Sequence, residues 1–227
     1  MQSPYTEDYF LRGKASGLSL YEDYRWLPDL TLPMVRRIID HLGIQKEDRI
    51  LDFGCSRGYV VKAFRHLGYT AHGIDISDWA ITNCDPDVKD FVSLAREPRE
   101  DYDWIIAKDV LEHIEPNLAM VTPERPFTTG ETINKLFTHA RKGVFIVVPL
   151  SESDWMRYVV PEYEKDVTHV VRWTLPRWLW ECSNYCGVDY DGSRAKWEIN
   201  SCYRIEGIKN NYAQWEKGNG FITARRI

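Results

Sequence analysis

Residues 51 to 58 read Leu-Asp-Phe-Gly-Cys-Ser-Arg-Gly, and this stretch decides the predicted fold. The apolar run that leads into it, residues 49 to 53, has the length of a short buried strand. The two glycines suit a turn in which the backbone passes close to a ligand, where a side chain would collide. Residues 59 to 67 then place apolar side chains on one helical face, and Gly68 stands where a helix ends. The pattern predicts a strand, a tight turn and a helix.

The same alternation continues beyond the turn. Residues 71 to 75 form a second apolar run that ends in Asp75, and Ser77 can cap a following helix. Weaker strand character lies between Val88 and Leu94, whereas residues 102 to 107 and 144 to 148 are apolar runs typical of strands buried on both faces. Strands that alternate with helices predict a parallel α/β sheet.

The two ends of the chain differ from this pattern. Residues 202 to 208 and 221 to 224 are joined by a polar stretch too short for a helical crossover, so we expect an antiparallel pair there. Residues 1 to 48 are rich in aromatic side chains and include an amphipathic helix around residues 33 to 42. We expect an aromatic cap at 1–48 and one main domain at 49–227. The proline-containing segment from 115 to 130 is predicted to be an insertion loop.

Composition excludes several classes of protein. A formal net charge of −5 gives no general attraction to phosphate backbones, which argues against a nucleic-acid partner. The opening residues MQSPYTEDYF lack the basic end and apolar run of a signal peptide, and no stretch approaches a membrane span. We therefore expect a soluble, cytoplasmic protein without a membrane partner. The five cysteines show no paired spacing for zinc, so they are interpreted as reduced packing residues and no metal site is predicted.

Read with Gly73-Ile-Asp-Ile-Ser77, the opening stretch resembles the first motifs of the class I S-adenosylmethionine (SAM)-dependent methyltransferases. Their first motif has the form acidic-x-Gly-x-Gly-x-Gly, and their second strand ends in an acidic residue. Ser56 departs from this form, because it stands at the middle glycine. The resemblance spans roughly residues 48 to 150. It implies a doubly wound, Rossmann-like α/β sheet of seven strands, mostly parallel with an antiparallel C-terminal strand.

The resemblance also implies S-adenosyl-L-methionine as the cofactor. An acid that ends the second strand can accept hydrogen bonds from both ribose hydroxyls, and Asp75 has that place. The residues assigned to the cofactor are Asp52, Gly54, Cys55, Ser56, Gly58, Asp75, Ile76, Lys108 and Asp109. A nicotinamide dinucleotide is disfavoured, because its G-x-G-x-x-G fingerprint requires glycines that the 54–59 segment lacks.

Two histidines are the catalytic candidates. His113 belongs to Val-Leu-Glu-His-Ile at 110–114, which resembles a signature of small-molecule methyltransferases, and His169 belongs to an Asp-x-Thr-His segment found in the same enzymes. An imidazole that titrates near neutrality suits deprotonation of an acceptor hydroxyl. The alternatives are that Glu112 and His113 bond within a helical turn, and that His169 is a buried structural donor.

These observations predict methyl transfer to an oxygen or nitrogen atom of a small molecule, such as a sugar, nucleotide sugar or secondary metabolite. DNA base methylation is disfavoured, because Lys-Asp-Val-Leu at 108–111 replaces the Pro-Pro-aromatic motif of amino-methylating enzymes. The alternatives are a non-catalytic SAM-binding or partner-stabilising module, and a nucleic-acid or protein methyltransferase. A homo-oligomer stays open.

The N-terminal aromatic residues are interpreted as a lid over the cofactor and acceptor. The aromatic side chains follow no helical or strand period, so one face of a buried element does not explain them: Tyr5, Tyr9, Phe10, Tyr21 and Tyr24. Gly13 and Gly17 give the backbone freedom to hinge, and a closed cover excludes water. The alternative is a static arm packed on the edge of the sheet.

Overall fold

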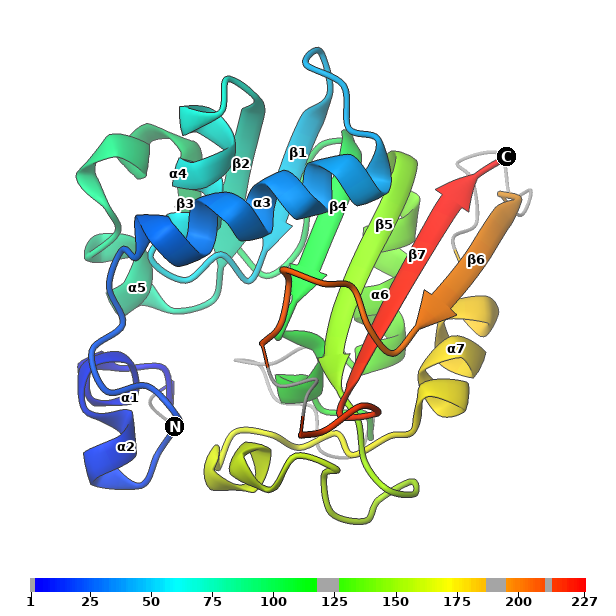
Figure 1. Cartoon of the computed structure of the whole chain (residues 1–227). Helices are drawn as coiled ribbons and strands as arrows, with labels where there is room; N and C mark the ends of the chain where they lie inside the picture. Colours follow the sequence, from blue (N-terminus) through cyan, green and yellow to red (C-terminus); the bar gives the residue numbers. More distant parts are fainter. Residues whose placement is uncertain (1–2, 118–126, 187–194, 211–213) are drawn as a thin grey trace.

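The computed structural model describes residues 3–117, 127–186, 195–210 and 214–227, and it contains one seven-stranded sheet with helices on both faces (Figure 1). The strand order is β3-β2-β1-β4-β5-β7-β6. Strands β1 to β5 are parallel, while β7 runs antiparallel to β5 and to β6. The predicted doubly wound α/β fold is confirmed. The strands are β1 (Arg49–Phe53), β2 (Thr70–Asp75), β3 (Val92–Leu94), β4 (Tyr102–Lys108), β5 (Ala140–Pro149), β6 (Trp197–Cys202) and β7 (Asn219–Arg226).

The helices form two layers and a small group at one end. Helices α3 (Pro28–Leu42) and α4 (Tyr59–His66) cover one face of the sheet, and α6 (Thr129–Thr138) and α7 (Leu175–Asn184) cover the other (Figure 1). The short α1 (Glu7–Leu11) and α2 (Gly13–Ser16) lie beyond the carboxyl ends of the parallel strands. The remaining helices are α5 (Asp78–Thr82) and the 3₁₀ helices η1 (Pro86–Phe91), η2 (Leu111–His113) and η4 (Pro161–Lys165).

Alternate residues of the central strands enter the two apolar layers, because side chains on a strand point to opposite faces in turn. In β5, Phe145 and Val147 pack towards α3 and α4, whereas Val144, Ile146 and Val148 pack towards α6 and α7. All five are fully buried. Burial on both faces explains why β5 reads as a continuous apolar run.

The elements next to the first turn lie close to their predicted places. Helix α4 and strand β2 each differ from the predicted range by one residue, and Ser77 caps α5 by accepting the backbone N–H of Ala80 at 3.0 Å. Helix α3 begins at Pro28, earlier than predicted, because proline suits the first turn of a helix. Only Val92–Leu94 of the predicted weak strand is extended, since η1 occupies the residues before it.

One predicted strand was wrong. Residues 202 to 208 do not form a strand, and β6 instead ends at Cys202. Ile205 and Ile208 are buried in the apolar layer that contains α3, where Arg37 donates from Nε to the Glu206 carbonyl at 3.0 Å. Ile205 and Ile208 are therefore apolar because they lie in a buried loop, not because they belong to a strand. The predicted antiparallel pair exists, between β6 and β7.

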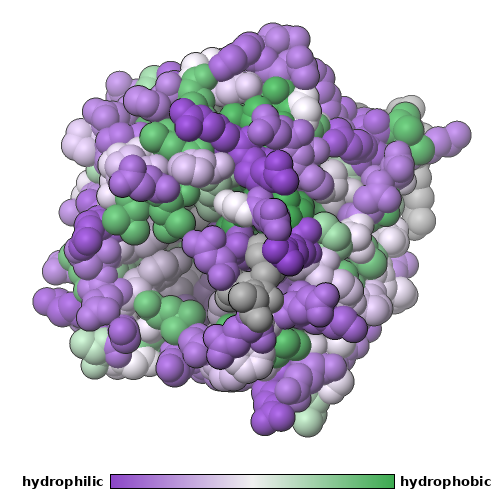
Figure 2. All heavy atoms as spheres, in the orientation of Figure 1, coloured by the Kyte–Doolittle hydropathy of each residue, from purple (hydrophilic) through white to green (hydrophobic). Residues whose placement is uncertain are grey.

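The remaining sequence expectations concern cysteines, the surface and the insertion loop. All five cysteines are free, and Cys55 and Cys182 are buried. Within the described ranges, no helix combines the length and apolarity that crossing a bilayer requires. Figure 2 shows a mostly hydrophilic face with separate hydrophobic patches. Residues 118–126 of the predicted insertion loop lie outside the described residues.

Gly143 gives a test of the packing between β4 and β5. It pairs with Trp104, and an added Cβ would stand 2.3 Å from the indole Cζ3 and 2.7 Å from the Ala224 carbonyl oxygen. We predict that Gly143→Ala lowers the free energy of unfolding by about 1–3 kcal/mol, measured by urea denaturation. The cost should be smaller in a Trp104→Leu background, and an equal cost in both backgrounds would contradict this packing.

Candidate active site

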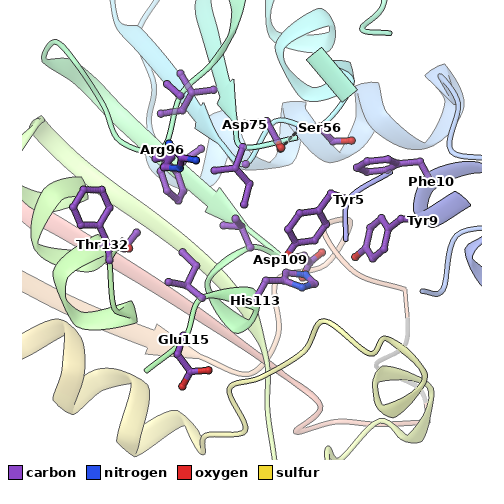
Figure 3. A pocket seen from close by; sticks show the side chains of 18 of the residues that line it. Tyr5, Tyr9, Phe10, Ser56, Asp75, Arg96, Asp109, His113, Glu115 and Thr132 are labelled. Atoms are coloured by element: carbon purple, nitrogen blue, oxygen red, sulfur yellow. Dashed lines mark hydrogen bonds between the residues drawn. The ribbon is translucent and has the colours of Figure 1, made fainter. Parts of the chain in front are cut away.

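A pocket opens at the carboxyl ends of β1, β2 and β4 and is covered by the N-terminal segment (Figure 3). It encloses about 910 Å³ of space, part of it open to solvent, which is within the size range of cofactor sites. In a doubly wound sheet this edge is where ligands bind. Its lining includes Tyr5, Tyr9, Gly54, Asp75, Asp109 and His113.

The turn after β1 forms one wall through a backbone in the left-handed region. Gly54 has φ 78°, Ser56 φ 50° and Gly58 φ 80°. A Cβ on Gly54 would lie 2.5 Å from Cγ2 of Val110, so only glycine fits there. Ser56 adopts the conformation that a glycine usually takes, which explains how it replaces the middle glycine without changing the turn.

Asp75, at the end of β2, fixes this turn and faces the pocket. Its Oδ2 accepts the backbone N–H of Ser56 at 2.7 Å, and its Oδ1 accepts the backbone N–H of Ser77 at 2.7 Å. A carboxylate has about four lone-pair sites, so the group keeps acceptor capacity beyond its backbone donors. Burial raises the pKa of Asp75, while hydrogen bonds from the backbone N–H groups of Ser77, Ser56 and Ile76 oppose that shift. Ile76 follows on the pocket wall.

Four of the residues predicted to hold the cofactor lie behind the wall. Asp52, Cys55, Gly58 and Lys108 do not line the pocket. Asp52 is buried, and burial raises its pKa to about 7 despite the nearby Lys108 ammonium. The predicted cofactor residues are thus divided into two groups. Five of them line the pocket: Gly54, Ser56, Asp75, Ile76 and Asp109. Asp52, Cys55, Gly58 and Lys108 do not line it.

Asp109 follows β4 and is held by two lysines. It adopts φ 55°, and both its carboxylate oxygens accept from Nζ of Lys209 at 2.7 Å while Oδ2 also accepts from Lys108 at 2.5 Å. Burial alone would raise the pKa of Asp109, but the two ammonium groups hold it below its ordinary value. Sequence reasoning missed Lys209, because a lone lysine in a polar loop between β6 and β7 carries no signal of its own.

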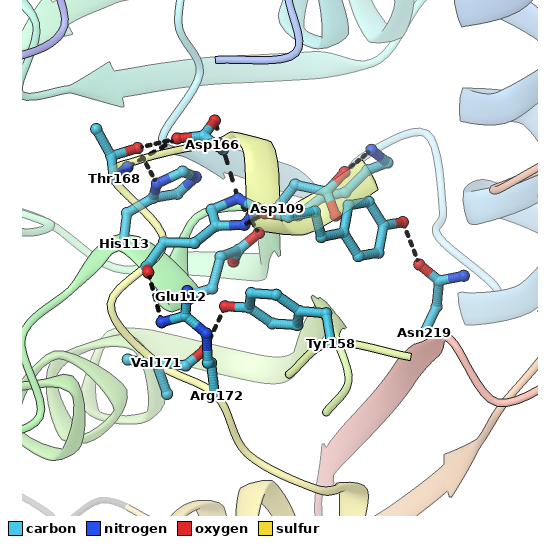
Figure 4. Close-up of polar contacts among 12 residues, drawn as sticks. Asp109, Glu112, His113, Tyr158, Asp166, Thr168, Val171, Arg172 and Asn219 are labelled. Atoms are coloured by element: carbon cyan, nitrogen blue, oxygen red, sulfur yellow. Dashed lines mark hydrogen bonds and ion pairs between the residues drawn. The ribbon is translucent and has the colours of Figure 1, made fainter. Parts of the chain in front are cut away.

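The two predicted histidines, His113 and His169, have ring centroids 4.7 Å apart. His113 lines the pocket and bonds through Nδ1 to Oγ1 of Thr168 at 2.8 Å (Figure 4). His169 is buried behind it and bonds through Nδ1 to the Tyr163 carbonyl at 2.9 Å. Burial lowers the pKa of both rings, that of His113 to about 4.

The N-terminal segment crosses the pocket and bonds to both of its sides. The Tyr5 carbonyl accepts from the Ser77 hydroxyl at 2.7 Å, beside the Asp75 loop. The Tyr9 hydroxyl donates to Oδ2 of Asp166 at 2.8 Å, on the side of the histidines. Phe10 stacks on Trp79 of α5 with centroids 5.4 Å apart. These aromatic side chains form the roof of the pocket.

A family model of the methyltransferase domain matches residues 28–200. The chain belongs to this methyltransferase family. The family uses S-adenosyl-L-methionine, and the glycine turn beneath the pocket and the free acceptor capacity of Asp75 fit that cofactor. The match begins at α3, so the segment that roofs the pocket precedes it. No curated protein matches the methyltransferase chain in sequence.

Solved structures share the fold at low sequence identity. A SAM-dependent methyltransferase from Archaeoglobus fulgidus has a TM-score of 0.54 at 19% identity, covering 88% of this chain and 94% of that chain. A Haloferax volcanii methyltransferase complex with the Trm112 activator has a TM-score of 0.56 at 12% identity, covering 87% and 90%. The magnesium protoporphyrin IX methyltransferase of Synechocystis with bound SAM has a TM-score of 0.52 at 13% identity, covering 86% and 79%.

Substitution of Asp75 tests directly whether the side of the pocket formed by the turn after β1 and Asp75 binds the cofactor. We predict that Asp75→Ala weakens SAM binding about ten- to a hundredfold, because hydrogen bonds to a charged group contribute roughly 1.5–3 kcal/mol. Isothermal titration calorimetry measures the affinity. Asp87→Ala, which removes an exposed carboxylate paired with Lys62, is the matched control and should bind normally. Equal affinities for all three proteins would remove Asp75 from the site.

Proposed function

We propose that the chain is an enzyme that transfers the methyl group of SAM to an oxygen or nitrogen atom of a small molecule. The observation that carries the proposal is the continuity of one pocket. Gly54 and Asp75 line it on the side expected to hold the cofactor, while His113 and the aromatic roof line the other side. A methyl donor and an acceptor can therefore share one enclosed space.

The roof favours a small acceptor. Tyr5, Tyr9 and Phe10 join the two sides of the pocket through hydrogen bonds and stacking, so the described residues cross the pocket where a polymer chain would have to pass. Aromatic walls suit a flat or sugar-like molecule. The negative net charge gives no general attraction to nucleic acid.

The residues of the chain contribute alignment and exclusion of water. SAM supplies a methyl group already activated on a sulfonium, so the protein mainly has to orient the reactants. The 54–58 turn and Asp75 fix the position of the donor, and Asp109 is locked in place by Lys108 and Lys209. The aromatic roof keeps water from the reacting atoms.

Product analysis tests the enzymatic claim. Incubation of the protein with SAM and fractions of a metabolite extract should yield S-adenosylhomocysteine in proportion to an acceptor in one fraction. Gly54→Val is expected to lose this activity and SAM binding, since its side chain would collide with Val110. If the wild-type protein binds SAM and no fraction gives product above the acceptor-free background, the non-catalytic alternative is correct.

We also propose that residues 3–24 act as the cover of the site. Tyr9 and Phe10 of this segment pack with Ala80 in a separate apolar cluster. This cluster does not belong to either of the two apolar layers that cover the sheet. Removal of residues 1–24 is therefore expected to leave cooperative thermal unfolding intact, while turnover falls at least about tenfold because water enters the site. Loss of cooperative unfolding would show that the segment belongs to the core.

Tyr9→Phe is the milder companion to that deletion. It removes the hydroxyl that bonds to Asp166 while keeping the buried ring. We expect faster release of SAM in rapid-mixing experiments and a melting temperature lowered by about 2–8 °C, because Oδ2 of the buried Asp166 loses its donor. A release rate equal to that of the wild-type protein would argue for a static arm.

A further inference from the structure

Glu112, His113 and His169 bring three metal-ligating groups together beside the pocket, which His113 lines. One ligand atom from each residue lies within 4.8 Å of the other two. Glu112 and His113 belong to η2, whereas His169 belongs to the segment after η4. The backbone N–H groups of Val170 and Val171 both donate to the Glu112 carbonyl, at 2.9 and 3.0 Å, and so hold the two segments together.

Hydrogen bonds leave a free nitrogen on each ring. The Tyr163 carbonyl can only accept, so Nδ1 of His169 carries the proton and Nε2 keeps a lone pair. The Thr168 hydroxyl donates to Oδ1 of Asp166 at 2.5 Å, so it accepts from Nδ1 of His113. Nε2 of His113 is then also a lone-pair donor. Metal-binding histidines are commonly fixed in this way by the bond of the other ring nitrogen.

Glu112 supplies a buried oxygen without a partner. Its side chain is 1% exposed, and Oε2 has no hydrogen-bond partner among the described residues. Nε2 of His169 lies 3.9 Å from Oε1, too far for a hydrogen bond. That gap fits two ligands that each lie about 2.0–2.2 Å from one ion. The nearby ammonium groups of Lys108 and Lys209 form ion pairs with Asp109 and not with Glu112.

We propose that Glu112, His113 and His169 bind one divalent transition-metal cation beside the methyl-donor pocket. Two imidazoles and one carboxylate on one side of an ion leave positions open for other ligands. The two imidazole nitrogens favour ions such as Fe²⁺ and Zn²⁺ over Ca²⁺ and Mg²⁺, while the carboxylate oxygen also suits Mn²⁺. No local sequence pattern marks this cluster, because 55 residues separate the adjacent Glu112 and His113 from His169.

The cation deepens the proposed function and rests on it, because His113 also lines the pocket. An open coordination position there would take an acceptor hydroxyl and lower its pKa. The oxygen electron pair then forms the new O–C bond, the C–S bond of SAM breaks with its pair left on sulfur, and the hydroxyl proton passes to water. This chemistry makes an oxygen atom the expected site of methylation.

Metal titration tests the site without any need for an acceptor. Protein stripped with a chelator and dialysed is titrated with Co²⁺, followed by its visible absorption, and with Mn²⁺, followed by electron paramagnetic resonance. We expect one ion per chain. Glu112→Gln and His169→Gln should each weaken binding at least about a hundredfold, and Thr168→Val about tenfold, since loss of an outer partner costs 10- to 100-fold.

His139→Gln is the matched control, because His139 is also partly buried and bonded to a carboxylate, Asp101, but lies at the end of α6 away from the pocket. It should bind both ions normally. Thermal unfolding without metal checks that every variant is folded, and SAM calorimetry without metal separates this proposal from the proposed function. Failure to bind one ion per chain, or equal binding by Glu112→Gln, His139→Gln and the wild-type protein, would overturn the site.

Discussion

The site depends on the two hydrogen bonds that the Asp75 carboxylate accepts from the backbone. By accepting the backbone N–H groups of Ser56 and Ser77, the carboxylate joins the turn after β1 to the start of α5. The turn can then hold left-handed positions at Gly54, Ser56 and Gly58, of which the one at Ser56 costs free energy unless its surroundings fix it. The glycine turn, the second strand and the wall of the pocket are therefore one unit.

The opposite wall is assembled from segments distant in sequence. η2 follows β4, the 166–171 segment docks on it through the Glu112 carbonyl, and Lys209 arrives from the loop before β7 to hold Asp109. The N-terminal segment then bonds to both walls, through Tyr5 beside α5 and through Tyr9 at Asp166. The two walls and the N-terminal segment are thus connected through a small number of polar contacts.

The sequence predicted what local chemistry determines. The strand, turn and helix around Gly54 and the acid at Asp75 follow from backbone freedom and strand length, and the structure places them as expected. Contacts over long separations could not be predicted: nothing local marks Lys209 as the partner of Asp109, or Glu112 as a neighbour of His169. The prediction of a strand at 202–208 was wrong for a related reason. Ile205 and Ile208 are buried in a loop, and this burial depends on the tertiary fold and not on the local sequence.

The central claim is that the pocket beside Asp75 holds the methyl donor with its reacting end towards His113. A crystal structure with S-adenosylhomocysteine tests it most directly. The account predicts ribose hydroxyls on the Asp75 carboxylate, the amino-acid end over the 54–58 turn, and the sulfur facing the His113 side beneath Tyr5 and Tyr9. Density for the ligand at another place, or a ribose that leaves Asp75 without contact, would contradict the account.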